Sequence, residues 1–261
     1  MKKLGLVLGS SGSRGASYIG FIKAMEENGV KADFVAGSSM GSVIGAAYCM
    51  GMPIDVMEKE LGGMKLSKLV DISLLPIRNR ALLRSKKLNK KIDSYFKGLC
   101  FDDLKIPFRA VATDLLTGET HVFSGHDNLT LGVTASSSIP TIFKPVSKDG
   151  MLLIDGGITC RLPIQQVRDM GAEVVVCVDG LGKTRQIGEK LNIIHVLTRS
   201  IDIMDGSITE KTIKELKPDL VLQPDLGNMS QYKFKNLKQA MQKGYELGLE
   251  NIETIKRLIE S

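Results

Sequence analysis

Long apolar runs are absent from this sequence. No apolar segment approaches the roughly 20 residues that a helix needs to cross a bilayer. The first apolar segment, 4–8, ends at Gly9, which is too early for the core of a signal peptide, so we interpret it as a buried strand. We therefore expect a cytoplasmic protein without a leader or a spanning helix, which leaves room for peripheral contact with the inner membrane surface.

Cysteine is scarce and widely spaced. Cys49, Cys100, Cys160 and Cys177 form no C-x-x-C pair and no pattern of metal ligands. In a chain without a signal peptide, such cysteines are expected to be reduced thiols in the core. The cysteines therefore predict no metal site.

The two common nucleotide-binding loops are also missing. The glycine-rich segment 9–15 has neither the spacing nor the lysine of a P-loop. A dinucleotide-binding loop needs G-x-G-x-x-G, but Ser10 replaces its first glycine. Asp33, the acid at about the right distance, begins the second expected strand instead of ending it. These departures argue against a nucleotide-binding function.

No nucleic-acid motif accompanies the basic residues, although the net charge is +6. The stretch 78–97 alone carries +7, because it holds eight basic residues and one acid, Asp93. Such a stretch suits an anionic partner, and the scarcity of aromatic residues favours anionic lipid over nucleic acid. A solvated helix face is the plainer alternative. The basic residues are Arg78, Arg80, Arg84, Lys86, Lys87, Lys90, Lys91 and Lys97.

Apolar strands alternate with helical segments along the chain, without repeats or a convincing linker. This alternation predicts a mostly parallel sheet with helices on both faces, and we expect residues 1–261 to form a single domain. The expected strands are 3–8, 34–36, 108–114, 120–123, 151–154, 173–178 and 220–222. The expected helices are 16–28, 40–50, 85–99, 129–138 and 237–259, with two more after Pro53 and Pro163.

The segment Gly37-Ser38-Ser39-Met40-Gly41 has the strand, G-x-S-x-G, helix order of a nucleophile elbow. Such a turn exposes a strained serine, here Ser39, while Gly37 and Gly41 allow strand and helix to approach closely. The following helix directs free N–H groups at a bound oxygen. A Gly/Ser-rich turn that merely packs a helix on a sheet is the structural alternative.

A serine nucleophile needs a base, and two kinds are available. His195 could form a triad with Asp179 in the chain order Ser…Asp…His, but it lies within an aliphatic run, where a core histidine is the simpler interpretation. Asp155 follows an apolar strand and precedes Gly156 and Gly157, so we expect it at the same sheet edge as Ser39. Capping of backbone amides is the alternative role for Asp155.

Five sequence blocks, in order, resemble the patatin-like phospholipase family. They span about 4–170 and comprise 6–15 with 19–21, 37–41, 112–115, 135–140 with 143–146, and 153–157 with Leu162-Pro163. The resemblance implies a patatin-type three-layer α/β/α fold with a mostly parallel central sheet. It also implies hydrolysis of acyl esters of lipids without metal or cofactor, of the phospholipase or lysophospholipase type.

The same resemblance implies roles for individual residues. Ser39 is expected to be the nucleophile and Asp155 the proton acceptor of a Ser–Asp dyad. The backbone N–H groups of Ser11, Gly12 and Met40 are expected to form the oxyanion hole. The remaining motif positions are Arg14, Gly15, Gly37, Gly41, Gly156 and Gly157.

The sequence departs from the family pattern at several positions. Ser10 and Ser11 stand where the oxyanion block usually has glycines, Tyr18 replaces a common histidine, and Cys160-Arg161 replaces a frequent Asp-Asn. None of these changes removes a catalytic group. They leave open two alternatives, a lipid-binding or regulatory pseudoenzyme and an acyltransferase to an acceptor other than water.

Overall fold

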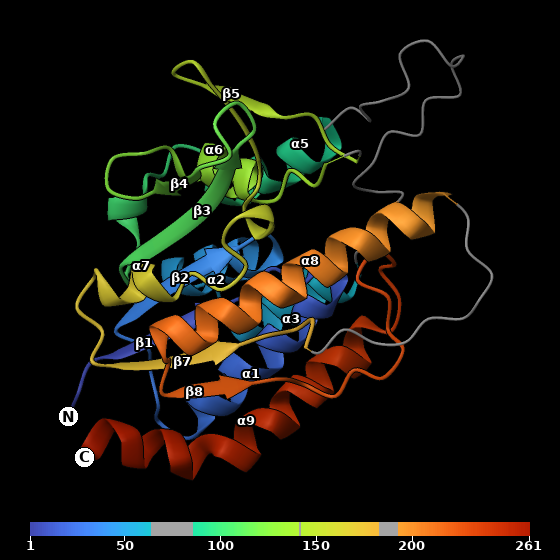
Figure 1. Ribbon diagram of the computed structural model, residues 1–261. Helices are drawn as coiled ribbons and strands as arrows, with labels where there is room; N and C mark the ends of the chain where they lie inside the picture. Colours follow the sequence, from blue (N-terminus) through green and yellow to red (C-terminus); the bar gives the residue numbers. More distant parts are fainter. Residues whose placement is uncertain (64–85, 141, 183–192) are drawn as a thin grey trace.

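A central eight-stranded sheet organises the part of the chain that the computed structural model describes, residues 1–63, 86–140, 142–182 and 193–261 (Figure 1). The strand order is β5-β6-β3-β2-β1-β7-β8, and β4 pairs with β3. Five neighbouring strands run parallel: β3 (Phe108–Asp114), β2 (Phe34–Ser38), β1 (Leu4–Leu8), β7 (Val174–Val178) and β8 (Leu220–Leu222).

The remaining strands are antiparallel. They are β4 (Thr120–Phe123), β5 (Val146–Lys148) and β6 (Met151–Asp155). The β3–β4 hairpin that the Thr117-Gly118 turn predicts is therefore present. The strand before Asp155 was expected to run parallel to the others. This expectation is wrong, because β6 runs antiparallel to β3.

Alternate side chains of the central strands enter two separate cores. Leu6 of β1 and Val176 of β7 join a large core, whereas Val7 and Cys177 join a smaller one on the opposite face. All five residues of β1 are buried, as expected for a parallel strand covered on both sides. This alternation confirms helices on both faces of a mostly parallel sheet.

The two faces carry different helices. The smaller core packs under α7 (Ile164–Arg168) and α8 (Ile193–Leu216), which lie on one side of the sheet (Figure 1). The large core packs against the helices of the other face. These are α1 (Ala16–Glu27), α2 (Met40–Met50), α3 (Ile54–Gly62), α5 (Lys86–Phe96), α6 (Leu129–Ser136) and α9 (Leu237–Glu260).

Helices α1 and α9 cross at unusually close range. A Cβ at Gly20 would lie 1.8 Å from the Met241 carbonyl oxygen, and one at Gly244 would lie 1.8 Å from that of Ser17. The buried face of α9, which includes Ile252 and Ile255, therefore packs on the side of α1. This contact ties the last helix of the chain to the first.

Several expected boundaries shift by a few residues. Helix α6 ends at Ser136, two residues earlier than expected. Pro53 caps α3 and Pro163 caps α7, each one position before the helix begins. Residue 85, where the helix 85–99 was expected to begin, lies outside the described residues.

Candidate active site

Ser39 occupies the strained turn that its motif predicts. Strand β2 ends at Ser38, α2 begins at Met40, and Ser39 between them has φ 54° and ψ −123°. A serine seldom adopts this backbone conformation unless the surroundings impose it. The glycines permit the close packing: a Cβ at Gly37 would lie 2.5 Å from the Gly41 carbonyl oxygen, and one at Gly41 would lie 2.0 Å from that of Leu8.

Three neighbouring serines hold this turn in place. The Ser39 N–H donates to Ser136 Oγ at 3.0 Å, and the Ser39 carbonyl accepts from Ser42 Oγ at 2.7 Å and from Ser137 Oγ at 3.4 Å. Sequence reasoning assigned no role to Ser136 or Ser137. Their location within the matched block 135–140 was the available signal.

Asp155 lies directly against the Ser39 hydroxyl. Ser39 Oγ donates to Asp155 Oδ2 at 2.5 Å, and Asp155 Oδ1 accepts the Gly157 N–H at 2.8 Å. Asp155 therefore also caps a backbone amide, which was the alternative role considered for it. Burial raises the pKa of Asp155 from 3.8 to about 6, against the opposing effect of these two hydrogen bonds. At neutral pH the carboxyl group is therefore mostly ionised, and its pKa is close enough to neutrality for it to act as a general base.

Register explains why the two side chains meet although β6 is antiparallel. Ser38 pairs with Val111 of β3, and Asp155 pairs with the next residue, Ala112. Strand β6 runs back along β3 and stops level with the end of β2. A Cβ at Gly156 would lie 2.2 Å from the Val111 carbonyl oxygen, so glycine is needed where the chain leaves the strand.

The described histidine side chains lie elsewhere. His121 is half-buried and packs edge-on against Phe123, and His126 is exposed beside Asp102 at 3.1 Å. His195 lies on α8, but its side chain falls outside those the structure describes. Asp179, its partner in the alternative triad, pairs with Arg161.

The loop that precedes α1 leaves two backbone amides available near Ser39. The N–H groups of Gly9, Ser10, Ser13 and Arg14 donate to carbonyls. Within the described part of the chain, those of Ser11 and Gly12 have no such acceptor. Gly12 has φ +53°, and a Cβ there would lie 2.4 Å from the Gln231 carbonyl oxygen, so this position requires glycine. The Met40 N–H opens helix α2.

Buried side chains fix this loop. Arg14 Nε donates to the Gly180 carbonyl at 2.6 Å. Tyr18 Oη donates to the Gly9 carbonyl at 3.0 Å and accepts the Gly180 N–H at 3.0 Å. The Tyr18 hydroxyl thus bridges Gly9 and Gly180. Burial raises the pKa of Tyr18, so the hydroxyl stays neutral. Gly15 lies against Met40, where a Cβ would come within 2.6 Å of Met40 Cγ.

An apolar pocket opens beside Ser39 and Gly12. Its volume is about 80 Å³, which is small compared with the 300–1,000 Å³ or so of typical ligand sites. A long acyl chain would therefore require side chains to move. The apolar lining comes from α2, α5, residues 139 and 142–143, and the 232–234 segment: Met40, Val43, Ile92, Tyr95, Phe96, Ile139, Ile142, Phe143, Tyr232 and Phe234.

A larger cavity of about 750 Å³ lies among α1, α3 and α9. It is lined by charges of both signs, including Lys23, Glu58 and Lys238, and it contains none of the predicted site residues. We place the candidate active site at the smaller pocket because the strained serine and its carboxylate partner lie there. Among the described residues, no cluster of three or more His, Cys, Asp and Glu side chains is arranged to bind a metal.

The basic stretch is only partly visible. Arg78, Arg80 and Arg84 lie outside the described residues, as do the side chains of Lys86 and Lys87. The apolar face of α5 packs on the protein, since Ile92 and Phe96 are buried and line the pocket.

None of the helices in the described ranges is at once long and apolar enough to span a bilayer.

Two solved structures share this fold. VipD from Legionella pneumophila superposes with a TM-score of 0.60 at 16% identity, covering 97% of this chain and 67% of that one. ExoU from Pseudomonas aeruginosa, in its complex with SpcU, superposes with a TM-score of 0.51 at 14% identity, covering 100% of this chain and 53% of that one. At these identities the likeness establishes the fold, which confirms the predicted patatin-type α/β/α architecture.

Relatives in sequence are more similar but much longer. An uncharacterised NTE family protein of Mycobacterium bovis is 34% identical over 178 residues, 67% of this chain and 48% of that protein. The neuropathy target esterase of Drosophila melanogaster and human patatin-like phospholipase domain-containing protein 6 are each 33% identical, over 184 and 182 residues. Each match covers 67% of this chain and 13% of that protein.

A sequence model of one family, the patatin-like phospholipases, matches residues 6–168. The match contains the loop before α1, the elbow and the Asp155 turn. With more than half of its length inside this match, and with Ser39 and Asp155 in hydrogen-bond contact, the chain belongs to the patatin-like phospholipase family.

Proposed function

We propose that the chain is a serine acyl hydrolase in which Ser39 and Asp155 form a catalytic dyad that cleaves acyl esters of lipids. The observation that carries this proposal is the 2.5 Å hydrogen bond from the Ser39 hydroxyl to a buried carboxylate at a strained turn. The printed names of the relatives, phospholipase and esterase, support the same class of substrate. We further propose that residues 1–261 act as one catalytic domain.

The proposed reaction begins with proton transfer. As Ser39 Oγ attacks the ester carbonyl carbon, its proton passes to Asp155 Oδ2, and the carbonyl oxygen becomes an anion. The proton then goes to the departing alcohol, which leaves an acyl-serine. Water attacks this ester with Asp155 again as the proton acceptor, and release of the acid restores the serine.

The anionic oxygen needs hydrogen-bond donors, and we propose the N–H groups of Ser11, Gly12 and Met40. The amides of Ser11 and Gly12 have no acceptor within the described residues, and Gly12, Ser39 and Met40 line one pocket. Helix α2 also directs the positive end of its dipole at this position. Each donor is worth about 3 kcal/mol of transition-state stabilisation.

The pocket supports an acyl group as the recognised part of the substrate. Most of the residues that line it are apolar, and Ser39 is one of the few polar residues among them. An acyl chain would bury its methylene groups there at about 0.8 kcal/mol each. We therefore propose phospholipids or lysophospholipids as substrates, with the acyl chain in the pocket and the head group toward solvent.

One experiment tests the proposed function. Wild type and Ser39→Ala are incubated with soluble 4-nitrophenyl esters, a phosphatidylcholine and a lysophosphatidylcholine. We expect hydrolysis by wild type and none above background by Ser39→Ala. A fluorophosphonate should add one adduct to wild type, which peptide mapping should place on Ser39, because the oxyanion hole also stabilises tetrahedral phosphorus.

Other outcomes identify the alternatives. Acyl transfer to an added alcohol in preference to water would indicate an acyltransferase. A folded wild type that binds lipid but neither turns over an ester nor reacts with the fluorophosphonate would be a lipid-binding pseudoenzyme. Adduct formation on a serine other than Ser39 would contradict the dyad.

We also propose that the basic stretch 78–97 contacts anionic membrane. Lys90 and Lys97 are exposed, whereas Lys91 pairs with Glu60 at 2.6 Å. Because Ile92 and Phe96 are buried, the contact would be electrostatic and would not require α5 to insert. This position beside the pocket would bring the site close to its substrate.

Charge reversal at exposed lysines tests this contact. Lys90→Glu with Lys97→Glu should lower binding to vesicles containing phosphatidylserine by tenfold or more at low salt, since each surface charge contributes about 1 kcal/mol. Vesicle sedimentation measures the effect, which should shrink as salt is added. Hydrolysis of a soluble ester should be unchanged.

The matched control carries the same charge change far from the site. Lys2 and Lys31 are exposed and precede β1 and β2, at the opposite ends of the strands from Ser39. Lys2→Glu with Lys31→Glu should leave vesicle binding near that of wild type. Equal binding by all three proteins would mean that the lysines of α5 are solvated surface.

A further inference from the structure

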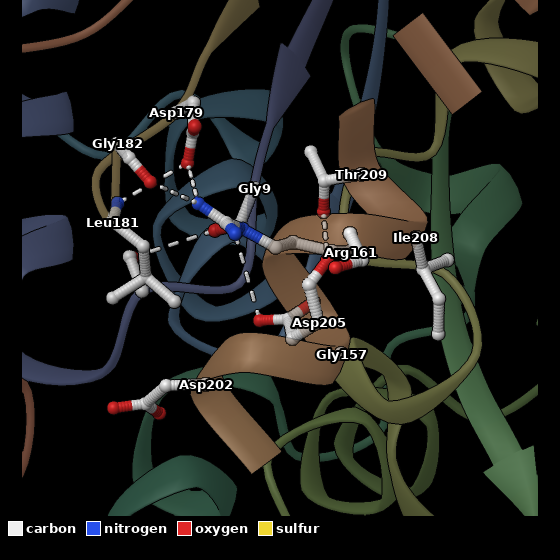
Figure 2. Close-up of polar contacts among 12 residues, drawn as sticks. Gly9, Gly157, Arg161, Asp179, Leu181, Gly182, Asp202, Asp205, Ile208 and Thr209 are labelled. Carbon is white, nitrogen blue, oxygen red and sulfur yellow. Dashed lines mark hydrogen bonds and ion pairs between the residues drawn. The ribbon is translucent and has the colours of Figure 1, made fainter. Parts of the chain in front are cut away.

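Arg161 is a buried cation that lies among Asp179, Gly182 and Asp205 (Figure 2). Its side chain is only 4% exposed, and it follows the Asp155 turn where the family often has asparagine. The guanidinium forms a very short ion pair with Asp179, which is 2% exposed, and its Nη1 lies 3.6 Å from Asp205 Oδ2. Nη2 also donates to the Gly182 carbonyl at 3.5 Å.

The carboxylates around Arg161 belong to other parts of the fold. Asp179 follows β7, and Gln223 follows β8. Asp179 Oδ2 accepts a hydrogen bond from Gln223 Nε2 at 2.9 Å. Asp205 comes from the middle of α8. Burial raises the pKa of Asp205 to about 7, whereas the charge of Arg161 favours its ionised form. Arg161 therefore connects the Asp155 turn, the end of β7 and α8.

Arg161 also contacts the loop 9–15, which carries the available amides of Ser11 and Gly12. The Arg161 carbonyl accepts the Ser10 N–H at 3.0 Å. Gly180, next to Asp179, accepts from Arg14 Nε at 2.6 Å and donates to Tyr18 Oη at 3.0 Å. The loop 9–15 also bonds to Val178 and to the 229–233 segment. Arg161 contributes to two further contacts, through its own carbonyl at Ser10 and through Asp179 beside Gly180.

We infer that Arg161 is a positioning residue, whose buried ion pair with Asp179 sets the place of the loop 9–15 relative to Ser39 and Asp155. The inference rests on the proposed function, because the loop is the proposed oxyanion hole. A displacement of about 1 Å between donors and nucleophile is enough to cost a hundredfold in rate. Arg161 itself touches neither Ser39 nor Asp155 in the described contacts, so it would act through the loop.

A single replacement cannot separate positioning from stability. Removing Arg161 alone leaves Asp179 buried without its partner, which destabilises the whole protein. Replacing both charges by uncharged groups of similar size removes that penalty, and Asp205, which also loses its cation, can remain protonated because burial raises its pKa. The double variant Arg161→Met with Asp179→Asn therefore tests the loop in a protein whose overall stability is restored.

The experiment compares wild type, Arg161→Met, Asp179→Asn and the double variant. The readouts are the melting temperature, kcat and KM for a soluble ester, and hydrogen exchange of the amides of Gly9, Ser10, Ser13 and Arg14. We expect each single variant to melt well below wild type and the double variant to melt close to it. In the double variant, kcat should remain at least tenfold lower with KM within twofold, and exchange of these amides should be at least tenfold faster, while α9 is unaffected.

Matched variants sharpen the comparison. Arg109 and Asp169 form a half-exposed ion pair at 3.6 Å, away from the loop. Arg109→Met with Asp169→Asn should change neither kcat nor the exchange of the loop amides. Arg161→Lys keeps the charge, and we expect it to fold, but one ammonium group cannot replace the planar fork. Its kcat should lie between those of wild type and the double variant.

The outcomes decide the inference separately from the proposed function. A double variant with wild-type kcat and wild-type loop exchange would show that the pair is only structural. If the double variant does not fold, Arg161→Lys decides by the same two readouts. A wild type that hydrolyses no ester overturns the proposed function, and loop exchange in the folded variants then decides the positioning role alone.

Discussion

Asp155→Asn is expected to lower kcat for ester hydrolysis by about 10³- to 10⁴-fold, because general-base catalysis contributes on this scale. Asparagine keeps the shape, and its Oδ1 can still accept the Gly157 N–H, while its Nδ2 would donate to the Ser39 oxygen at the place where Asp155 Oδ2 accepts. It cannot take up the proton of Ser39. Steady-state kinetics with a soluble ester measure the loss, and circular dichroism checks that the fold is unchanged.

The same substitution is expected to stabilise the protein. Burial raises the pKa of Asp155 from 3.8 to about 6, so the folded protein binds this proton more tightly than the unfolded chain does. Its ionisation therefore lowers the free energy of unfolding as pH rises from about 4 to 6, and the full cost is present at neutral pH. At 1.36 kcal/mol per pKa unit, this cost is about 3 kcal/mol. Denaturant unfolding at pH 7 and pH 4 should show a gain for Asp155→Asn that shrinks at the lower pH.

The pH profile of the wild type provides an independent check. A base must be unprotonated to accept the Ser39 proton, so kcat/KM should fall about tenfold per pH unit below pH 6 and level off above it. His195→Gln should keep most of the activity. A large loss in His195→Gln with an intact fold, or full activity in Asp155→Asn, would favour a histidine base.

Gly41→Ala is expected to damage both stability and activity. The added Cβ would lie 2.0 Å from the Leu8 carbonyl oxygen and 2.8 Å from that of Gly9, so α2 and the end of β1 must separate by more than 1 Å. Overpacking of this severity against buried backbone costs about 3 kcal/mol of the free energy of unfolding. The loop 9–15 begins at the same point, and its displacement should reduce kcat about a hundredfold.

Urea unfolding and ester kinetics measure both effects, and Gly62→Ala is the control. Gly62 ends α3, and a Cβ there meets nothing within 4 Å. In a helix this change should leave the stability within about 1 kcal/mol of wild type or slightly above it. A Gly41→Ala protein as stable and active as wild type would mean that strand and helix can separate freely at the elbow.

Local patterns were enough to predict the architecture. The apolar runs at β1 and β7 predicted buried parallel strands, and the G-x-S-x-G spacing predicted a strained serine between β2 and α2. These features follow from neighbouring residues, since burial on two faces and close packing at a turn leave direct traces in composition. The ordered blocks from about 4 to 170 predicted the family, which the match over 6–168 confirms.

Long-range contacts could not be read in the same way. The direction of β6 depends on its pairing with β3, about 40 positions earlier, and nothing within β6 specifies it. The sequence predicted a helix over 85–99 but not that Ile92 and Phe96 would line the pocket. Periodicity shows that a face is apolar, whereas its partner is chosen by packing.

The sequence by itself determined the family, the layered sheet and the turn at Ser39, because these depend on residues close together in the chain. The tertiary structure shows the contact of Asp155 with Ser39 that the family resemblance implied. It alone decided that Ser136 and Ser137 support the turn and that Arg161 lies buried between Asp179 and Asp205. Each of these contacts joins segments that are distant in sequence, and a buried charge is stable only where the folded chain supplies its partners.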